Sequence, residues 1–206
     1  MDIVEVKSAA NYQSALITLL QDCVDSGASV GFLPPLTTEE STRYWQGVEA
    51  DLAAGHRKLW LALEQQQLVG AIQLALCGKA NGRHRAEVEK LMVLQTARGK
   101  GAGRALMQAL EQGAHAAGRS LLVLDTRTGD VASHLYRQLG YLDSRPDPEL
   151  CTQRRWLPCC DRHLLQTALT IPYPLSKYSR AAPVCLNTAN CSPQNSTKQT
   201  ERLIND

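Results

Sequence analysis

The stretch LMVLQTARGKGAGRALMQALEQG, residues 91–113, constrains the fold of this chain more than any other. An apolar run, typical of a buried strand, breaks into a basic glycine-rich turn and continues into an amphipathic pattern that predicts a helix. A helix N-terminus presents free backbone N–H groups and the positive end of the helix dipole. Glycines there let the backbone approach an anion closely. The stretch therefore predicts a phosphate or pyrophosphate cradle between a strand and a helix.

Two common nucleotide motifs do not fit this turn. A Walker A loop needs Ser or Thr directly after Gly-Lys, and Gly101 follows Gly99-Lys100 here. A dinucleotide fold places its glycines after the first strand of a parallel unit, whereas this turn follows a fourth strand. A tight strand–helix connection without any ligand is the remaining alternative from the glycines alone.

Hydrophobic periodicity predicts the element order βααβββαβα. Helices are expected over 12–27, from Thr37 or Thr38 to Gly55, from the glycine turn to about Ala117, and over 131–140. Strands are expected over 2–9, 58–65, 68–77, 86–94 and 120–126. Hairpin-joined strands precede the turn, and a strand–helix–strand unit follows, which predicts a parallel pair with a right-handed crossover. The fold class is therefore α/β (α+β), with a mixed central sheet flanked by helices.

Composition limits the partners and the compartment. The net charge of +2 argues against nucleic acid or an anionic membrane surface as partner, and no apolar run is long enough to span a bilayer. The acidic N-terminus does not resemble a secretory signal, so a cytoplasmic protein is expected. The five cysteines after residue 150 match no metal-binding spacing, and no metal site is expected.

Sequence character changes after Ser144. Residues 145–206 lack a sustained period and are rich in Pro, Ser, Thr and Asn. We therefore expect one domain over 1–144 and an irregular or disordered tail over 145–206.

Two motifs in this domain resemble a known superfamily. Arg98-x-x-Gly101-x-Gly103, preceded by EKLMVL, resembles motif A of the GCN5-related N-acetyltransferase (GNAT) superfamily, and LYRQLGY at 135–141 resembles the end of its motif B. GASVGF, ADLAAG, NGRHRAEVEKLMVL and LLVLDT more closely resemble the tabtoxin resistance proteins, which acylate the amino group of a β-lactam toxin. The resemblance implies a GNAT fold and acetyl-CoA-dependent transfer to a primary amine of a small molecule, such as a toxin or antibiotic. The resemblance is compatible with a homodimer.

The resemblance also implies where acetyl-CoA is held. The pyrophosphate would lie on the glycine turn, and the pantetheine arm would pair with the preceding strand through the main chain of Met92 and Leu94. A nearby backbone N–H would polarise the thioester carbonyl. The expected cofactor-binding residues are Met92, Val93, Leu94, Arg98, Gly99, Lys100, Gly101, Ala102, Gly103 and Arg104.

Three side chains are the expected catalytic groups. Tyr136 is the candidate general acid, because a phenol beside the sulfur can donate a proton as the thiolate leaves. A carboxylate must take the proton of the amine, and Asp125, at the end of a strand next to the cofactor strand, is the first candidate. Glu89 and its neighbour Glu87 are rivals. In the alternative interpretation Tyr136 packs in the core, Asp125 caps a turn and the glutamates are solvated.

The tail raises a hypothesis about its reading frame. Family members continue with two strands that carry Asp-Gly and then Ile-Tyr-Tyr-Lys. Read one base later, codons for Arg155-Trp156-Leu157 can spell Asp-Gly-Tyr, and codons for His163–Thr167 can spell Ile-Tyr-Tyr-Lys. We therefore hypothesise that residues 145–206 are out-of-frame translation.

The frame hypothesis defines an alternative function. A chain without its final hairpin would be a GNAT domain that binds CoA but is catalytically impaired. A plain phosphate or nucleotide binder is a third candidate.

Overall fold

The structure, a computed structural model, describes residues 1–127 and 129–142, together with the backbone of one further strand at Leu164–Thr170. These residues belong to one compact unit, Met1–Ile171. Within them, no helix combines the length and apolar character that crossing a membrane requires. The tail cysteines, the boundary at residue 144 and the frame hypothesis lie outside the described residues.

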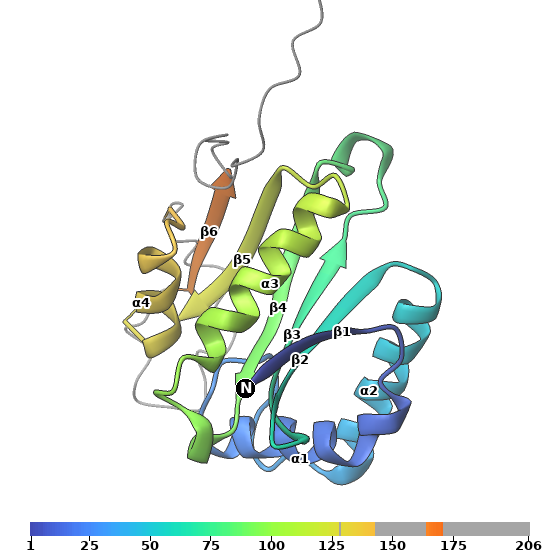
Figure 1. Cartoon of the computed structure of the whole chain (residues 1–206), viewed down its shortest axis with the longest axis vertical. Coiled ribbons are helices and arrows are strands. Elements are labelled where there is room, and N and C mark those ends of the chain that lie inside the picture. Colours follow the sequence, from blue (N-terminus) through green and yellow to red (C-terminus); the bar gives the residue numbers. More distant parts are fainter. Residues whose placement is uncertain (128, 143–163, 171–206) are drawn as a thin grey trace, which may run out of the picture. The chain divides into compact units, whose positions relative to one another are not determined.

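The described residues form one sheet of six strands, in sequence order from β1 to β6 (Figure 1). Its strands are β1 (Asp2–Val6), β2 (Arg57–Glu64), β3 (Gln67–Leu76), β4 (Arg85–Val93), β5 (Leu121–Arg127) and β6 (Leu164–Thr170). Neighbouring strands are antiparallel except β4 and β5, which are parallel. The predicted mixed sheet with one parallel pair is therefore confirmed.

Strand β6 differs from the expectation of an irregular tail. It pairs with β5 over the whole length of β5, from Leu121 opposite Thr170 to Arg127 opposite Leu164. Without this partner β5 would present an unpaired edge of N–H and C=O groups, which sheets tend to cover. Residues 164–170 thus form a strand within the stretch for which irregular structure is expected.

In the described part of the chain, four α-helices occupy the predicted places in the chain order. They are α1 (Gln13–Asp25), α2 (Thr38–Ala53), α3 (Ala102–Ala116) and α4 (Val131–Gln138), with short 3₁₀ turns at Ala10–Tyr12, Ala80–Gly82 and Gln95–Ala97. Thr37, one of the two predicted candidates, is the N-cap of α2. Its hydroxyl accepts a hydrogen bond from the backbone N–H of Glu40, and its own N–H donates to the Glu40 carboxylate.

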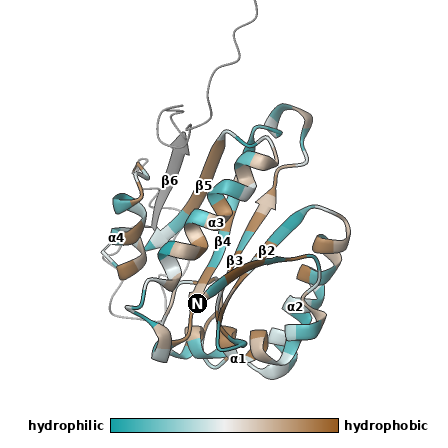
Figure 2. Ribbon diagram, viewed as in Figure 1, coloured by the Kyte–Doolittle hydropathy of each residue, from teal (hydrophilic) through white to brown (hydrophobic). Residues whose placement is uncertain are grey.

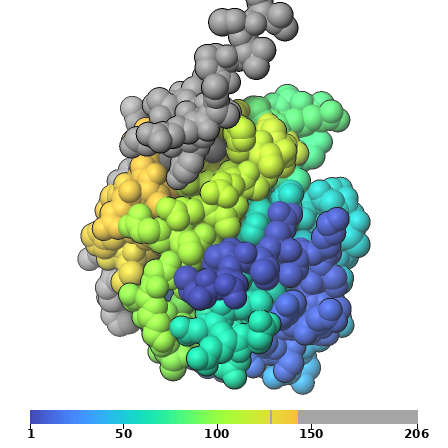
Figure 3. All heavy atoms as spheres, in the orientation of Figure 1, coloured from blue at the N-terminus to red at the C-terminus, as the bar shows by residue number. Residues whose placement is uncertain are grey.

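The helices cover both faces of the sheet. Helices α1 and α2 pack on one face, where the buried Trp45 donates its indole N–H to the carbonyl of Leu16 at 3.1 Å. Helix α3 packs on the other face through Leu106, Met107 and Leu110, and its side chains form a band across the face seen in Figure 3. Figure 2 shows apolar residues concentrated in the central strands and polar residues along α2.

A bulge in β4 changes which side chains face which layer. Gln73 of β3 lies opposite Glu89, but Ala71, two residues earlier, lies opposite Met92, three residues later, so β4 carries one extra residue. Lys90, with φ of 51°, lies at this bulge. Val88 packs in the α3 layer before the bulge and Met92 in the α1–α2 layer after it.

Strands β4 and β5 pair only near their beginnings. The last pair is Glu87 with Val123, and the rest of β4 has no strand partner on that side among the described residues. This opening between two parallel strands, at their carboxyl ends, is a common place for ligand sites.

Candidate functional site

The glycine turn opens α3 with backbone geometry that only glycine adopts easily. Gly99 and Gly101 have φ of 78° and 88°, in the left-handed region. Gly101 is the N-cap and supplies no side-chain hydrogen bond, and the first helical bond runs from the N–H of Ala105 to its carbonyl. The N–H groups of residues 102–104 therefore have no partner within the helix and are available to an anion.

Close packing behind the turn accounts for its third glycine. A Cβ on Gly103 would lie 3.3 Å from Cδ2 of Leu135 in α4. Gly103 therefore lets α4 approach the N-terminus of α3. This approach places the LYRQLGY segment, residues 135–141, next to the glycine turn.

The three predicted cations of the turn have different surroundings. Arg98 donates from Nε to the carbonyl of Val93 at 3.1 Å and from Nη2 to the hydroxyl of Ser26 at 2.7 Å. Arg104 donates to the side-chain carbonyl of Gln138 in α4 at 2.5 Å. Lys100 lies 3.7 Å from the exposed Glu64. Arg98 thus connects the turn to the end of α1, and Arg104 connects it to α4. Lys100 lies beside Glu64 instead.

The backbone of β4 leads from the turn towards the middle of the sheet. The N–H of Leu94 donates to the carbonyl of Val69 in β3 at 2.9 Å. Because hydrogen-bonding directions alternate along an antiparallel strand, Met92 also faces β3, and the peptide groups of Leu91 and Val93 face the open side. The carbonyl of Val93 accordingly accepts from Arg98 and from the thiol of Cys23. The peptide groups of Met92 and Leu94, the expected main-chain partners of the cofactor, therefore face β3.

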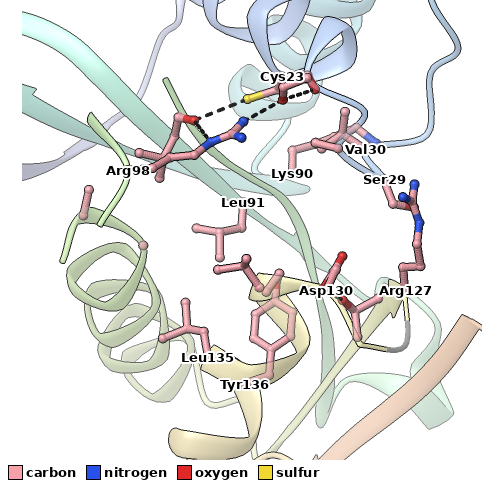
Figure 4. A pocket seen from close by; sticks show the side chains of 18 of the residues that line it. Cys23, Ser29, Val30, Lys90, Leu91, Arg98, Arg127, Asp130, Leu135 and Tyr136 are labelled. Atoms are coloured by element: carbon pink, nitrogen blue, oxygen red, sulfur yellow. Dashed lines mark hydrogen bonds between the residues drawn. The ribbon is translucent and has the colours of Figure 1, made fainter. Parts of the chain in front are cut away.

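These elements surround an open pocket of about 710 Å³ (Figure 4). Of the predicted cofactor residues, seven line it: Val93, Arg98, Gly99, Gly101, Ala102, Gly103 and Arg104. Met92, Leu94 and Lys100 do not. Among the described residues, no three His, Cys, Asp or Glu side chains lie together in a way that could hold a metal ion.

Tyr136 lies in the wall of the pocket that α4 forms (Figure 4). Asp130 caps this helix by accepting from the N–H of Ser133 at 2.8 Å. Tyr136 is 7% exposed and its ring lies 5.7 Å from that of Tyr141. Burial, more than the nearby Asp130 carboxylate, raises the pKa of Tyr136 well above its usual value. The phenol therefore keeps its proton at neutral pH and can act as a donor.

The candidate bases have different environments. Asp125 lines the pocket, and partial burial raises the pKa of its carboxyl. Glu87 lies near it, and the pKa of Glu87 is raised by burial and then by the charges of Glu89 and Asp125. Glu89 does not line the pocket and forms an ion pair with Arg57 at 2.5 Å. Only Asp125 of the three is both in the pocket and without an ion pair among the described residues.

The pocket residues that were not expected from the sequence include Cys23, Ser26, Lys90 and Arg127. Cys23 and Ser26 reach the pocket from the end of α1 through contacts across some 70 positions, for which no local signal exists. Arg127 could have been found, because the period of two along β5 places it on the same face as Asp125.

Comparison with known proteins shows which family this chain resembles. The model of the acetyltransferase (GNAT) family matches residues 24–141. The fold is similar to that of ribosomal-protein-alanine N-acetyltransferase from Brucella melitensis, with a TM-score of 0.65 at 22% identity over 83% of this chain and 100% of that chain. It is also similar to yncA from Salmonella typhimurium, solved with its cofactor acetyl-CoA, with a TM-score of 0.66 at 18% identity over 89% and 98%. A GCN5-related N-acetyltransferase from Kribbella flavida gives 0.65 at 21% identity over 82% and 98%.

Proposed function

Because this chain belongs to the GNAT acetyltransferase family, whose co-substrate is acetyl-CoA, we propose that it moves the acetyl group to a primary amine of a small molecule. The observation that carries the proposal is the continuous path from the glycine turn along the open edge of β4 to Tyr136 and Asp125, all lining one pocket. A resistance role against an amine-bearing toxin or antibiotic is consistent with this chemistry.

We propose that the turn and the edge of β4 hold the cofactor. The N–H groups at the start of α3, together with Arg98 and Arg104, suit a pyrophosphate, since backbone donors and the helix dipole favour negative charge there. The peptide groups of Leu91 and Val93 replace Met92 and Leu94 as the proposed partners of the pantetheine arm, which would pair with β4 as an added strand does.

The bulge supports a role for one backbone donor in the chemistry. The N–H of Leu91 follows the bulge at Lys90 and faces the open side of β4. A donor held in the backbone needs no reorganisation when negative charge develops on a carbonyl oxygen. We assign the Leu91 N–H the task of polarising the thioester carbonyl that acetyl-CoA supplies.

Three proton movements complete the proposed transfer. The acceptor ammonium, whose pKa is about 10 by analogy with lysine, loses its proton to Asp125, directly or through one water, and the amine nitrogen bonds to the acetyl carbon. The carbon–sulfur bond breaks, and Tyr136 donates its proton to the sulfur. The acylated nitrogen then releases its second proton through water to the tyrosinate, which restores the phenol, and Asp125 returns its proton to solvent. Raising the pKa of Asp125 makes it a better proton acceptor near neutral pH, and the buried Tyr136 is available as a donor.

Two measurements test the proposal. Acetyl-CoA and CoA should raise the unfolding temperature of the full chain, with ATP as the comparison that detects a general phosphate binder. Thiol release from acetyl-CoA over a panel of primary amines should then exceed the rate without amine. Stabilisation by ATP as strong as by CoA would contradict CoA recognition, and absence of amine-dependent thiol release would contradict transfer.

The frame hypothesis keeps the impaired domain as a second candidate. It rests on the Asp-Gly-Tyr and Ile-Tyr-Tyr-Lys patterns that the codons of the tail can spell one base later. We propose to sequence the gene and to compare the chain with one whose codons after Ser144 are read in the shifted frame. If both bind CoA but only the re-read chain transfers acetyl groups, the impaired candidate holds. Codons that cannot spell the two patterns would remove it.

A further inference from the structure

The pocket continues past the glycine turn to a second, charged end. Asp125 and Arg127 reach it from one face of β5, Ser29 from the loop after α1, and Lys90 from the bulge in β4. Figure 4 shows the Arg127 guanidinium extending towards Ser29, on the opposite side of the pocket from Arg98. The two ends therefore carry separate cations, and those of the second end are remote from the proposed pyrophosphate site.

The cations of this end have no carboxylate partner among the residues that the structure describes. Within the described part of the chain, neither Arg127 nor Lys90 forms an ion pair. Arg127 donates from Nη2 to the carbonyl of Gly27 at 3.3 Å, which leaves most of its five N–H donors for other partners. Lys90 lies over the rings of Phe32 and Tyr44 at 5.6 and 5.5 Å, contacts that hold the ammonium without neutralising it.

Burial makes the charge of Lys90 costly. Lys90 is only partly exposed, and burial lowers the pKa of its ammonium, an effect that the charges of Glu89 and Glu87 oppose. Among the described residues, no carboxylate lies within ion-pair distance of Lys90 or Arg127. An anion bound beside both cations would offset the remaining cost.

From this arrangement we infer that the acceptor is an amine that also carries a carboxylate. Arg127 binds the carboxylate through its planar fork, Lys90 adds a second positive charge, and Asp125, two residues before Arg127 on β5, receives the proton of the amine. The inference rests on the proposed transferase function and adds its substrate class. Polyamines and strongly basic peptides are poor acceptors on this assignment, because both cations repel them.

The test compares acceptors that differ only in the carboxylate. Phenylalanine is paired with phenethylamine and β-alanine with ethylamine, and aminoethyl phosphate is added to distinguish a phosphate site from a carboxylate site. A charge-assisted hydrogen bond contributes about 1.5–3 kcal/mol, so kcat/KM of the full chain should be about 10- to 100-fold higher for the carboxylate member. Equal values, a preference for the plain amine, or a preference for aminoethyl phosphate would overturn the inference.

Variants identify the residue responsible. Arg127→Gln should bring the ratio of the two kcat/KM values towards one, mainly through KM of the carboxylate acceptor, and Arg127→Lys should restore part of it. Arg43→Gln, the same change on the exposed surface of α2 outside the pocket, should keep the ratio. If Arg127→Gln changes both acceptors equally, Arg127 only supports the end of α1 and the assignment is wrong.

A binding measurement separates this inference from the proposed function. Calorimetry of the CoA complex with N-acetylphenylalanine and N-acetylphenethylamine needs no turnover. Preferential binding of the carboxylate product, lost in Arg127→Gln, supports the anion site even if no amine is acetylated, which would count against the transferase alone. Binding without preference contradicts the anion site whether or not transfer occurs.

Discussion

Tyr136 and Asp125, the proposed proton donor and proton acceptor, line the same pocket. Burial raises the pKa of both groups, with opposite chemical effects. The tyrosine remains a protonated phenol over the whole physiological range, and the aspartate becomes a stronger base than a solvated carboxylate. The same physical cause therefore suits each residue to its proposed role.

Removal of the Tyr136 hydroxyl tests the role of the donor. Tyr136→Phe keeps the ring beside Tyr141, so the fold and CoA binding should change little. General acid catalysis typically contributes about 10²–10⁴-fold, and kcat for thiol release should fall by at least about 100-fold. Tyr12→Phe, outside the pocket, is the matched control and should keep the original kcat. A Tyr136→Phe enzyme with unchanged kcat would show that the phenol only packs.

Asp125 links activity and stability to pH in opposite directions. Its pKa is raised in the folded chain, so the folded state binds more protons than the unfolded state between the ordinary aspartate pKa and the raised value. Stability contributed by the protonated form is present below that window and lost as pH rises through it. Asp125→Asn should therefore raise the melting temperature near pH 7 but not near pH 3, and abolish most of kcat.

A pH profile completes the test of Asp125. The acid limb of kcat should lie above the range of an ordinary aspartate and should vanish in Asp125→Asn. Glu89→Gln is the comparison, since Glu89 is paired with Arg57 and lies outside the pocket. Loss of the acid limb in Glu89→Gln, with Asp125→Asn unaffected, would reverse the assignment of the base.

At the scale of single elements, α3 depends on the backbone of the turn before it. Gly101→Ala places a side chain at φ of 88°, which costs about 1–2 kcal/mol. We expect lower stability and weaker CoA binding, measured by chemical denaturation and calorimetry. Gly47→Ala, in the helical and exposed part of α2 where a Cβ meets nothing within 4 Å, should instead stabilise by up to about 1 kcal/mol. Equal effects of the two changes would contradict the strained turn.

The turn and the strand before it differ in how far their sequences determine the site. Glycine, basic residues and the onset of apolar periodicity are local signals, and they predicted the turn and the start of α3. The peptide groups that face the open edge depend on the register between β3 and β4, and no local pattern encodes that register. For this reason Met92 and Leu94 were expected where Leu91 and Val93 lie.

At the scale of the whole molecule, the pocket lies where β4 and β5 diverge, between the α3 layer and the α1–α2 layer. The α3 layer contributes the turn, the α1–α2 layer contributes Cys23 and Ser29, and β4 and β5 part between them. Sequence periodicity predicted this element order and the parallel pair. It could not predict that the end of α1 reaches the turn, because the Ser26–Arg98 contact joins residues 72 positions apart.

The contribution of β6 can be measured on the whole chain. A chain that ends at Leu142 loses seven cross-strand pairs with β5, each worth about 0.2–1 kcal/mol. Its free energy of unfolding should fall by a few kcal/mol, whereas a chain that ends at Ile171, where the compact unit ends, keeps those pairs. Equal urea midpoints for the two shortened chains would show that β6 adds no stability.

The bulge at Lys90 has a consequence for comparing this chain with its relatives. Side chains alternate between the two faces of a strand, and the one extra residue reverses this alternation in the part of β4 that follows it. Glu87 and Glu89 therefore share a face with Met92 rather than with Leu91 and Val93. A gap placed on the wrong side of Lys90 in an alignment would pair acidic side chains with residues of the opposite layer. Homologous bases are therefore best matched by counting from the start of β4, and homologous cofactor contacts by counting back from Arg98.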